Sequence, residues 1–343
     1  MIDGHGDDLF RFPPESVRVN FSTNIWQHAD LAPLRRFMAG RLGFAASYPE
    51  PAPRSLEAYI ARRLGVEAAE VLVSAGATDA IYSIAAAERR RPACIIGAPT
   101  FSEYADGWCA YADVAPTYTD ATPEALALAP HGALIWLCNP NNPTGAVVRP
   151  EEIRSLAASR PDALFVIDQA YAAYCAETLL TPSDATALPN LIVLHSLTKQ
   201  SCVPGLRIGY ATGSAPLLER IRAVRQPWSV SALASDAARF LLDNPVAIPA
   251  GGLRAEISRI AAALKGIGIG SLPTSTNFLL ARLPHGLSAA RLKSDLMASD
   301  GLLIRDASNF HGLTTAHFRI AAQRPAENDH LIRSLTRWIS SHA

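Results

Sequence analysis

Short runs of apolar residues alternate with helical patterns through the first two thirds of the chain. Six of these runs have the length of a buried β-strand, and they fall at residues 71–76, 94–97, 133–138, 163–168, 191–195 and 207–212. Strands that are apolar throughout are buried on both faces and are typical of parallel sheets covered by helices. The sequence therefore predicts an α/β fold with a mostly parallel central sheet.

The pattern changes after about residue 213, where helical segments dominate and the strands become short. We expect three such strands and one final amphipathic helix, at residues 276–283, 302–306, 317–321 and 328–339. These features indicate a smaller α+β domain, and we expect the weakly patterned N-terminus to join it. The predicted division is a large domain of residues 46–245 and a small domain of residues 1–45 and 246–343.

The balance of charge and the placement of cysteine exclude several classes of protein. Lys and Arg total 31, as do Asp and Glu, so no basic excess suggests nucleic acid as a partner. No apolar run approaches the roughly 18 residues of a membrane-spanning helix, and the polar N-terminus does not resemble a signal peptide. Five scattered cysteines, never in a Cys-x-x-Cys pair, argue against disulfides or a metal site. We expect a cytoplasmic protein that acts on a small molecule, without metal, nucleic acid or membrane.

Lysine is rare in this chain, which narrows the search for amine chemistry. It occurs at Lys199, Lys265 and Lys293 only. Lys265 ends a predicted helix and Lys293 lies within one, whereas Lys199 follows a buried strand in a loop rich in Ser, Pro and Gly. Arg207 lies eight residues further along that loop. Lys199 is therefore the candidate reactive amine, the alternative being a solvated loop with two surface charges.

Three other strand ends carry residues that could meet Lys199, because the carboxyl ends of parallel strands share one edge of the sheet. Asp168 closes the strand at 163–168, where a carboxylate can also be a simple loop anchor. Residues 139–145, Asn-Pro-Asn-Asn-Pro-Thr-Gly, follow the preceding strand and could equally be a tight turn. The junction at 74–79, Ser-Ala-Gly-Ala-Thr-Asp, leads from a strand into a helix, and such a helix N-terminus binds anions.

Taken together, these groups fit pyridoxal phosphate. The cofactor needs an amine for its aldehyde, here Lys199, and an anion beside its ring nitrogen, here Asp168. Its phosphate needs fixed donors, which an arginine fork and a helix N-terminus supply. Hydrogen-bonding groups for the ring oxygen are available at Asn142 and Tyr171.

The order of these motifs resembles the fold-type I pyridoxal-phosphate enzymes of the class I/II aminotransferase group. The shared motifs are Asn-Pro-Asn-Asn-Pro-Thr-Gly, a strand ending in Asp-x-x-Tyr, and Ser-x-x-Lys with an arginine eight residues later. The likeness as a whole covers nearly the whole chain. The resemblance implies Lys199 as the Schiff-base lysine and Asp168 as the partner of the pyridine nitrogen, with Asn142 and Tyr171 at the ring hydroxyl. At the cofactor phosphate it implies Gly76, Ala77, Thr78, Ser196 and Arg207.

The same resemblance implies a stacking residue and a second subunit. An aromatic side chain covers the cofactor ring in this family, and we expect Phe101, with Tyr104 as the alternative. The family is dimeric, and a tyrosine of the partner subunit reaches the cofactor phosphate. Tyr48, in Ser-Tyr-Pro-Glu-Pro, matches that tyrosine, so we expect a homodimer.

Two arginines near the C-terminus bear on the substrate. Arg305 and Arg319 each lie on a predicted short strand, where a surface ion pair is the alternative. In many aminotransferases the arginine matching Arg319 binds the substrate carboxylate. In the branch of histidinol-phosphate aminotransferase and threonine-phosphate decarboxylase, both matching arginines bind the substrate phosphate, and two arginines suit a dianion better than one.

Several details favour the decarboxylase of that branch. The N-terminal pair His5-Gly6 and the segments 20–24, 99–104 and 304–310 match it. The match departs at Asp7, which replaces a second glycine, and in a shortened insert at 311–316. Histidinol-phosphate aminotransferase or a related class I/II aminotransferase is therefore the alternative.

We expect a threonine-phosphate decarboxylase of cobalamin biosynthesis, with four substrate-binding residues: His5, Asn24, Arg305 and Arg319. For His5 the alternative is a mobile terminal histidine. The two reactions differ in which bond of the substrate's α-carbon stands perpendicular to the cofactor ring, and that geometry is not written in the sequence.

Other α/β functions fit less well. The dense glycine run at 266–270 follows a helix and lacks the Gly-x-Gly-x-x-Gly spacing of dinucleotide-binding enzymes. The Gly-x-Ser-x-Gly motif of serine hydrolases is absent. A regulator that keeps this fold without its activity is the non-enzyme alternative, which the combination of Lys199, Asp168 and Arg207 disfavours.

Overall fold

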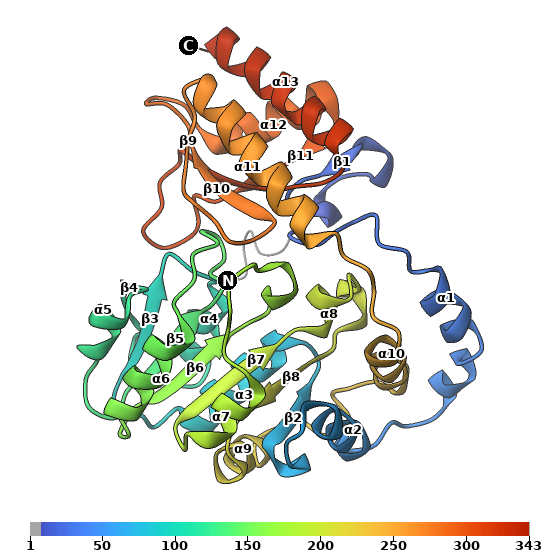
Figure 1. Ribbon diagram of the computed structural model, residues 1–343, viewed down its shortest axis with the longest axis vertical. Coiled ribbons are helices and arrows are strands. Elements are labelled where there is room, and N and C mark those ends of the chain that lie inside the picture. Colours follow the sequence, from blue (N-terminus) through green and yellow to red (C-terminus); the bar gives the residue numbers. More distant parts are fainter. Residues whose placement is uncertain (1–7, 343) are drawn as a thin grey trace.

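Seven strands from distant parts of the chain form one sheet in the computed structural model, which describes residues 8–342 (Figure 1). From edge to edge the strands are β2 (Val71–Ser74), β8 (Gly209–Thr212), β7 (Leu191–His195), β6 (Leu164–Asp168), β5 (Leu134–Cys138), β3 (Cys94–Ala98) and β4 (Thr117–Asp120). Strand β8 runs antiparallel to β2 and β7, and every other pairing is parallel. The expected mostly parallel α/β sheet is confirmed, with one reversed strand.

The edge strand β4 was not expected from the sequence. Its four residues, Thr-Tyr-Thr-Asp, are exposed or only partly buried. An edge strand is covered on fewer sides than a central one and tolerates polar residues. The strand therefore lacks the continuous apolar run that identifies the others.

Helices cover both faces of the large sheet, because successive residues of a strand point to opposite faces. In β5, Trp136 packs into the hydrophobic cluster on one face, and its neighbour Ile135 packs into the cluster on the other. The helices of the first cluster are α3 (Ala77–Glu88), α4 (Glu103–Cys109) and α9 (Ala215–Arg222). Those of the second are α5 (Pro123–Ala127), α6 (Pro150–Ser159) and α7 (Pro182–Ala187). Near the β2 edge lie α2 (Arg54–Leu64) and α10 (Ala232–Asp243).

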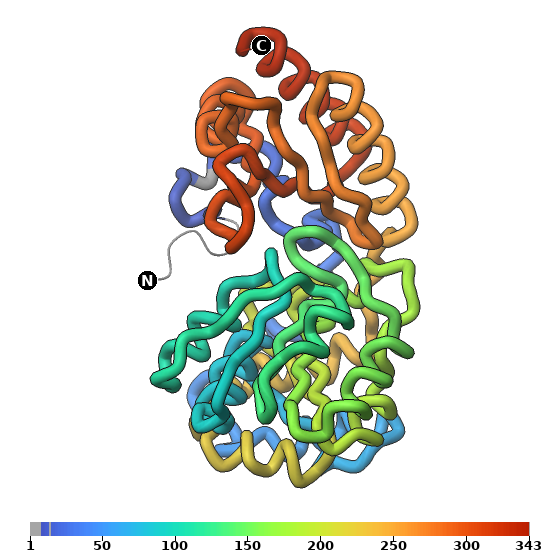
Figure 2. Tube along the Cα trace, turned by 90° about the vertical axis from the view of Figure 1, so that its left-hand side faces the viewer, coloured from blue at the N-terminus to red at the C-terminus, as the bar shows by residue number. Residues whose placement is uncertain are grey.

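A second unit is built on a smaller antiparallel sheet, which Figure 2 shows in orange and red stacked on one end of the large unit. Its strands, in order, are β12 (Arg305–Asp306), β13 (His317–Ala321), β10 (Phe278–Arg282) and β9 (Gly270–Ser271). One hydrophobic cluster joins this sheet to α11 (Ala250–Gly266), α12 (Ala289–Asp300) and α13 (Pro325–His342). The expected strand at 302–306 is divided, since Leu302–Leu303 forms a separate strand, β11.

The N-terminal segment contacts both units. Strand β1 (Val19–Asn20) pairs in parallel with β11. Helix α1 (Ala32–Ala39) then packs on α10, where Leu34 joins Ala237 and Leu241 in a small hydrophobic cluster. The domain boundaries read from the sequence stay a prediction.

The remaining elements are short. They are helix α8 (Leu197–Gln200) and the 3₁₀ helices η1 (Leu9–Arg11), η2 (Pro14–Ser16), η3 (Leu42–Ala46), η4 (Ala68–Glu70), η5 (Ala172–Tyr174) and η6 (Pro204–Leu206). Within residues 8–342, no helix has both the length and the apolar character needed to cross a membrane.

Candidate active site

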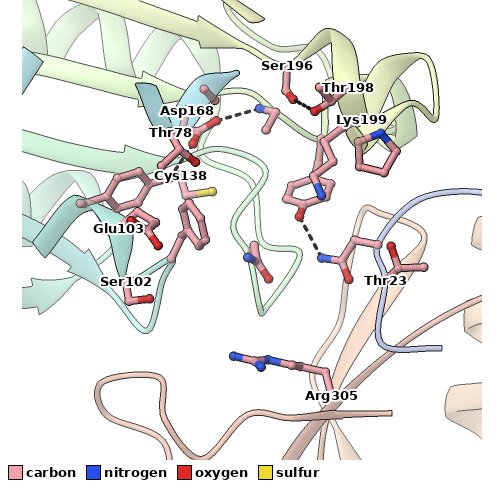
Figure 3. Close-up of a pocket in the computed structure, with 18 of the residues that line it drawn as sticks. Thr23, Thr78, Ser102, Glu103, Cys138, Asp168, Ser196, Thr198, Lys199 and Arg305 are labelled. Carbon is pink, nitrogen blue, oxygen red and sulfur yellow. Dashed lines mark hydrogen bonds between the residues drawn. The ribbon is translucent and has the colours of Figure 1, made fainter. Parts of the chain in front are cut away.

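A cavity of about 460 Å³ lies between the two units. On the large unit it is lined by residues at or just beyond the carboxyl ends of β5, β6 and β7, the edge at which α/β sheets place their ligands. On the other side Arg305 reaches in from β12, opposite Lys199 and Ser196 (Figure 3). The two units therefore share one site.

The structure brings most of the sequence-predicted residues to this cavity. Those that line it are Asn24, Ala77, Thr78, Phe101, Asn142, Asp168, Tyr171, Ser196, Lys199, Arg207, Arg305 and Arg319. Gly76 lies behind the lining, Tyr48 lies on the surface with 89% of its area exposed, and His5 falls outside the described residues. Their individual roles stay predictions.

Asp168, the last residue of β6, is held by two hydrogen bonds. The hydroxyl of Tyr104 donates to Oδ2 at 2.8 Å, and the N–H of Ala170 donates to Oδ1 at 2.9 Å. Burial raises the pKa of Asp168, while these two hydrogen bonds and the charge of Lys199 oppose that rise. A cation bound in the cavity would favour the ionised carboxylate further.

The two aromatic candidates for stacking on the cofactor ring occupy different places. Tyr104 is fully buried and stacks on Trp136, with ring centroids 5.0 Å apart and planes 10° from parallel. Phe101 is only partly buried, lines the cavity, and meets the Tyr104 ring edge to face at 5.8 Å. The position of Phe101 suits the stacking role, and Tyr104 is instead the hydrogen-bond donor behind Asp168.

Lys199 extends into the cavity from α8. Its Nζ lies 5.8 Å from the ring centroid of Tyr171, and among residues 8–342 it is the single lysine that lines the cavity. The Tyr171 hydroxyl accepts a hydrogen bond of 3.1 Å from the side-chain amide of Asn24, which comes from the N-terminal segment. The N-terminal segment therefore orients a side chain of the large unit.

An anion-binding cradle forms where α3 begins. Ala77 and Thr78 are the first residues of that helix, so their N–H groups lack partners in a preceding turn. Gly76 has φ of 88°, and a Cβ there would lie 2.7 Å from Nη2 of Arg207, so the guanidinium packs directly on this glycine. Ser196 Oγ lies 2.8 Å from Thr198 Oγ1, and both residues line the cavity. Backbone donors, two hydroxyls and one arginine fit a phosphate group.

Arg305 and Arg319 occupy directly paired positions on the antiparallel strands β12 and β13. Both side chains line the cavity, and the residues are only 4% and 5% exposed. Arg319 donates to the side-chain oxygen of Asn142 and, at 2.6 Å, to the carbonyl of Ser22. Like charges at directly opposite positions of a sheet repel each other, so this arrangement favours an anion between them.

Several lining residues were missed by sequence reasoning. They are Ser22, Thr23, Ser102, Glu103, Cys138, Ala170, Thr198, Pro204 and Phe310, with Tyr104 missed in its actual role. Most of them are immediate neighbours of predicted residues, and that adjacency is the signal that could have found them. Ser22 is fully buried, and its Oγ has no hydrogen-bond partner among residues 8–342.

The arrangement satisfies what pyridoxal phosphate requires. Gly76, Arg207 and the start of α3 would hold the phosphate, Asp168 would face the ring nitrogen, and Asn142 and Tyr171 would meet the ring oxygen. When bound, this cofactor supplies an electron-accepting ring. Within residues 8–342, no group of three or more His, Cys, Asp or Glu side chains is placed to hold a metal ion.

Comparison with known proteins assigns the family. The sequence profile of aminotransferase class I and II matches residues 19–335. Histidinol-phosphate aminotransferase 2 of Cupriavidus pinatubonensis is 31% identical over 319 residues, covering 86% of this chain and 84% of that protein. Threonine-phosphate decarboxylase of Salmonella typhimurium is 30% identical over 346 residues, covering 92% and 90%. The crystal structure of L-threonine-O-3-phosphate decarboxylase from Porphyromonas gingivalis is 35% identical with a TM-score of 0.89, covering 93% of this chain and 99% of that one.

The chain belongs to the class I and II aminotransferase family. It is an enzyme that depends on pyridoxal phosphate and has the fold-type I architecture, and it is either an aminotransferase or a decarboxylase. The resemblance read from the motifs is confirmed at this level. Enzymes of this family act on small molecules.

Proposed function

We propose that this enzyme decarboxylates L-threonine O-3-phosphate, a reaction of cobalamin biosynthesis. The observation that carries the proposal is the pair of buried arginines, Arg305 and Arg319, that occupy paired positions on β12 and β13 and both line the cavity. A phosphate monoester carries close to two negative charges at neutral pH and can accept hydrogen bonds from both guanidinium groups. The similarity to the Porphyromonas gingivalis decarboxylase adds support.

The same pair bears on the choice of reaction. If both arginines bind the phosphate, neither neutralises the substrate carboxylate, and a strong ion pair with that carboxylate would stabilise the ground state and slow its loss. Phe101 and Tyr171, which carry no charge at neutral pH, line the same cavity. With both arginines on the phosphate and the carboxylate left without an ion pair, breaking the bond between Cα and the carboxylate is favoured.

Lys199 has the central position for proton transfer. When the bond to the carboxylate breaks and carbon dioxide leaves, Cα must gain a proton in its place. Lys199 lies at the cavity wall with its amine beside Tyr171, so we assign it the delivery of that proton. Asn142 and Tyr171 would orient the ring oxygen, and Arg207 would fix the cofactor phosphate.

A paired assay tests the proposal. Purified holoenzyme is given threonine phosphate, and carbon dioxide and any keto acid are measured; the second reaction contains histidinol phosphate and 2-oxoglutarate, and glutamate is measured. We expect carbon dioxide without keto acid in the first reaction and no glutamate in the second. Glutamate formation without carbon dioxide would overturn the assignment.

Histidinol-phosphate aminotransferase is the second candidate, because a relative of that name is 31% identical over most of the chain. Its substrate also carries a phosphate monoester, so Arg305 and Arg319 would serve either enzyme. The candidates differ at the substrate carboxylate, which histidinol phosphate lacks. The paired assay therefore separates them directly.

We also propose a homodimer formed through an exposed apolar patch that consists of Leu42, Phe44, Tyr48 and Trp228. These side chains are 62%, 44%, 89% and 52% exposed, and the Tyr48 and Trp228 rings lie 6.2 Å apart. Exposed apolar patches of this kind mark interfaces. We expect sedimentation to show a dimer, and Trp228→Asp to give monomer; a wild-type monomer at micromolar concentration would contradict the proposal.

A cytoplasmic location completes the proposal. All five cysteines are free thiols, and Cys94, Cys138 and Cys202 are buried. Free thiols are typical of proteins in a reducing compartment. Fractionation of cells that express the protein at native level would place the activity in the cytoplasmic fraction.

A further inference from the structure

Three charged side chains, two of them buried and one partly buried, meet beside the substrate side of the cavity. The Nζ of Lys293 donates a hydrogen bond to Oδ2 of Asp8, and Nη1 of Arg305 lies 3.5 Å from the same oxygen. The side chains of Asp8, Arg305 and Lys293 are 4%, 5% and 15% exposed. Of the three, only Arg305 lines the cavity, and Figure 3 shows it extending into that space. Asp8 and Lys293 therefore lie behind Arg305, outside the cavity lining.

The cluster is a product of the fold rather than of a local pattern. Asp8 lies just before η1, Lys293 lies in α12, and Arg305 lies in β12, so Asp8 and Lys293 are 285 residues apart in sequence. Asp8 has the left-handed backbone conformation, with φ of 57°, which Asp tolerates better than most residues. Burying an ion pair is costly because the loss of hydration can exceed the attraction between the charges, so such a cluster is weak evidence for stability and points to another role.

The charges do not cancel. Three cations lie near one carboxylate. Lys293 donates a hydrogen bond to Asp8, whereas the contact of Asp8 with Arg305 is longer than a normal hydrogen bond, and the half-exposed Arg11 lies 3.7 Å from the other carboxylate oxygen. Arg305 donates instead to Asn309, through Nη2 at 3.1 Å. Burial lowers the pKa of Arg305, and the Asp8 carboxylate opposes that shift. Arg305 is thus held in place by an anion whose charge is already offset by Lys293.

We propose that Asp8 and Lys293 are positioning residues that hold Arg305 toward the cavity and keep this end of the site net positive, so that it selects a dianion over a monoanion. The inference rests on the proposed function, in which the dianion is the phosphate of the substrate. Asp8 fixes the direction of the guanidinium, and Lys293 prevents the Asp8 charge from repelling the ligand. Neither residue touches the ligand.

A competing role for Asp8 predicts the opposite effect on anion binding. The carboxylate could act as a stand-in anion that occupies Arg305 until a substrate displaces it. Removal of the Asp8 charge would then strengthen the binding of anions. In the positioning role, the same change weakens binding, because Arg305 loses the partner that directs it.

The test measures binding without turnover. Ethyl phosphate and ethyl sulfate carry no amine and cannot react with the cofactor, and at pH 8 the first is a dianion because the second ionisation of a phosphate monoester lies at about pH 6. Isothermal titration of the holoenzyme should show tighter binding of ethyl phosphate than of ethyl sulfate. Asp8→Asn should weaken the binding of ethyl phosphate about tenfold, the order expected for one charged contact. Equal or tighter binding by Asp8→Asn overturns the proposal.

Lys293→Met tests the proposed role of Lys293, which is to offset the charge of Asp8. It also tests the proposal as a whole if Asp8→Asn does not fold. This variant leaves the Asp8 carboxylate without its neutralising partner, so ethyl phosphate should lose more affinity than ethyl sulfate. The double variant should bind no more weakly than Asp8→Asn alone, because Lys293 acts through Asp8. Independent, additive losses would refute the coupling.

Asp300→Asn is the matched control. Asp300 also pairs with a cation of the small unit, at 2.8 Å from Arg337, but neither residue lines the cavity. Its replacement should leave both affinities unchanged. The outcomes also separate the two proposals: if ethyl phosphate binding depends on Asp8 but threonine phosphate releases no carbon dioxide, the subsite stands and the proposed reaction falls.

Discussion

The two ends of the cavity are built in different ways. The cofactor end, defined by Asp168, Lys199 and Arg207, comes from segments that follow neighbouring strands of one sheet. The substrate end, defined by Arg305 and Arg319, belongs to the second sheet and depends on contacts with the N-terminal segment, at Ser22 and Asp8. In the proposed function, the first sheet therefore holds the cofactor and the second sheet selects the substrate.

This contrast predicts that changes at the two ends have different effects. The cofactor end is set by short motifs, and we expect a change there to reduce cofactor binding or turnover. The substrate end is assembled from positions far apart in sequence, and we expect a change there to alter substrate affinity while leaving the cofactor in place. Three substitutions and one change of pH follow, from the largest expected effect to the smallest.

Lys199→Ala should have the largest effect. Loss of the amine removes both the covalent partner of the cofactor and the proton donor, and we expect turnover to fall by a factor of about 10³ or more. Absorbance of the bound cofactor and product formation would be measured together. A variant that keeps both the absorbance of the bound cofactor and its turnover would contradict the assignment of Lys199 to the cofactor.

Arg319→Ala should act on affinity at the substrate end. A hydrogen bond to a charged group contributes about 1.5–3 kcal/mol, which predicts a rise in KM of roughly 10- to 100-fold. The cofactor should still bind. Arg282→Ala is the control, since Arg282 lies exposed on β10 of the same sheet; unchanged kinetics in both variants would place the substrate anchor elsewhere.

Tyr104→Phe should weaken the binding of the cofactor without abolishing it. The variant keeps the stack on Trp136 but removes the donor to Asp168, so the pKa of Asp168 should rise further. We expect the apoprotein to bind pyridoxal phosphate about tenfold more weakly, as for one charge-assisted hydrogen bond. Tyr111→Phe, on the exposed surface, is the comparison, and equal affinities would show that the hydroxyl is not needed.

Acid should destabilise the large unit through His195. Burial lowers the pKa of His195 to about 4, whereas the unfolded chain takes up the proton near 6.5, so stability is lost as pH falls from 6.5 toward 4. Because His195 as a whole is only partly buried, we expect about 1 kcal/mol of lost unfolding free energy between pH 7 and 5. Chemical denaturation of His195→Gln should lack this component, and identical pH dependence would assign the loss to other groups.

The contrast between the cofactor end and the substrate end also explains which site residues could be predicted from the sequence. Asp168 and Lys199 could be found because each follows an apolar strand, and Arg207 because its spacing from Lys199 is local. The role of Tyr104 could not be found, since only the packing of α4 against β5 turns its hydroxyl toward Asp168. Lys293 looked like an ordinary helical residue, because nothing near it in sequence indicates Asp8 as its partner.

The strands of the fold likewise differ in how well the sequence predicts them. Central strands are mostly apolar and could be located from their apolar runs, whereas β4, at the edge, is mostly polar and could not. The expected strand at 302–306 is broken at Ile304, since its first half pairs with the N-terminal β1 and its second with β13. Pairing of this kind depends on chain segments that are distant in sequence.

The two buried guanidinium groups of β12 and β13 have a practical consequence for anyone who purifies or assays the protein. If they bind the substrate phosphate as proposed, multivalent buffer ions such as sulfate and inorganic phosphate should compete with it and should make a weak ligand look weaker still. Salts of this kind should raise the melting temperature, as any ligand of the folded state does. Kinetic constants for this enzyme will therefore be comparable between laboratories only when the buffer anion is the same.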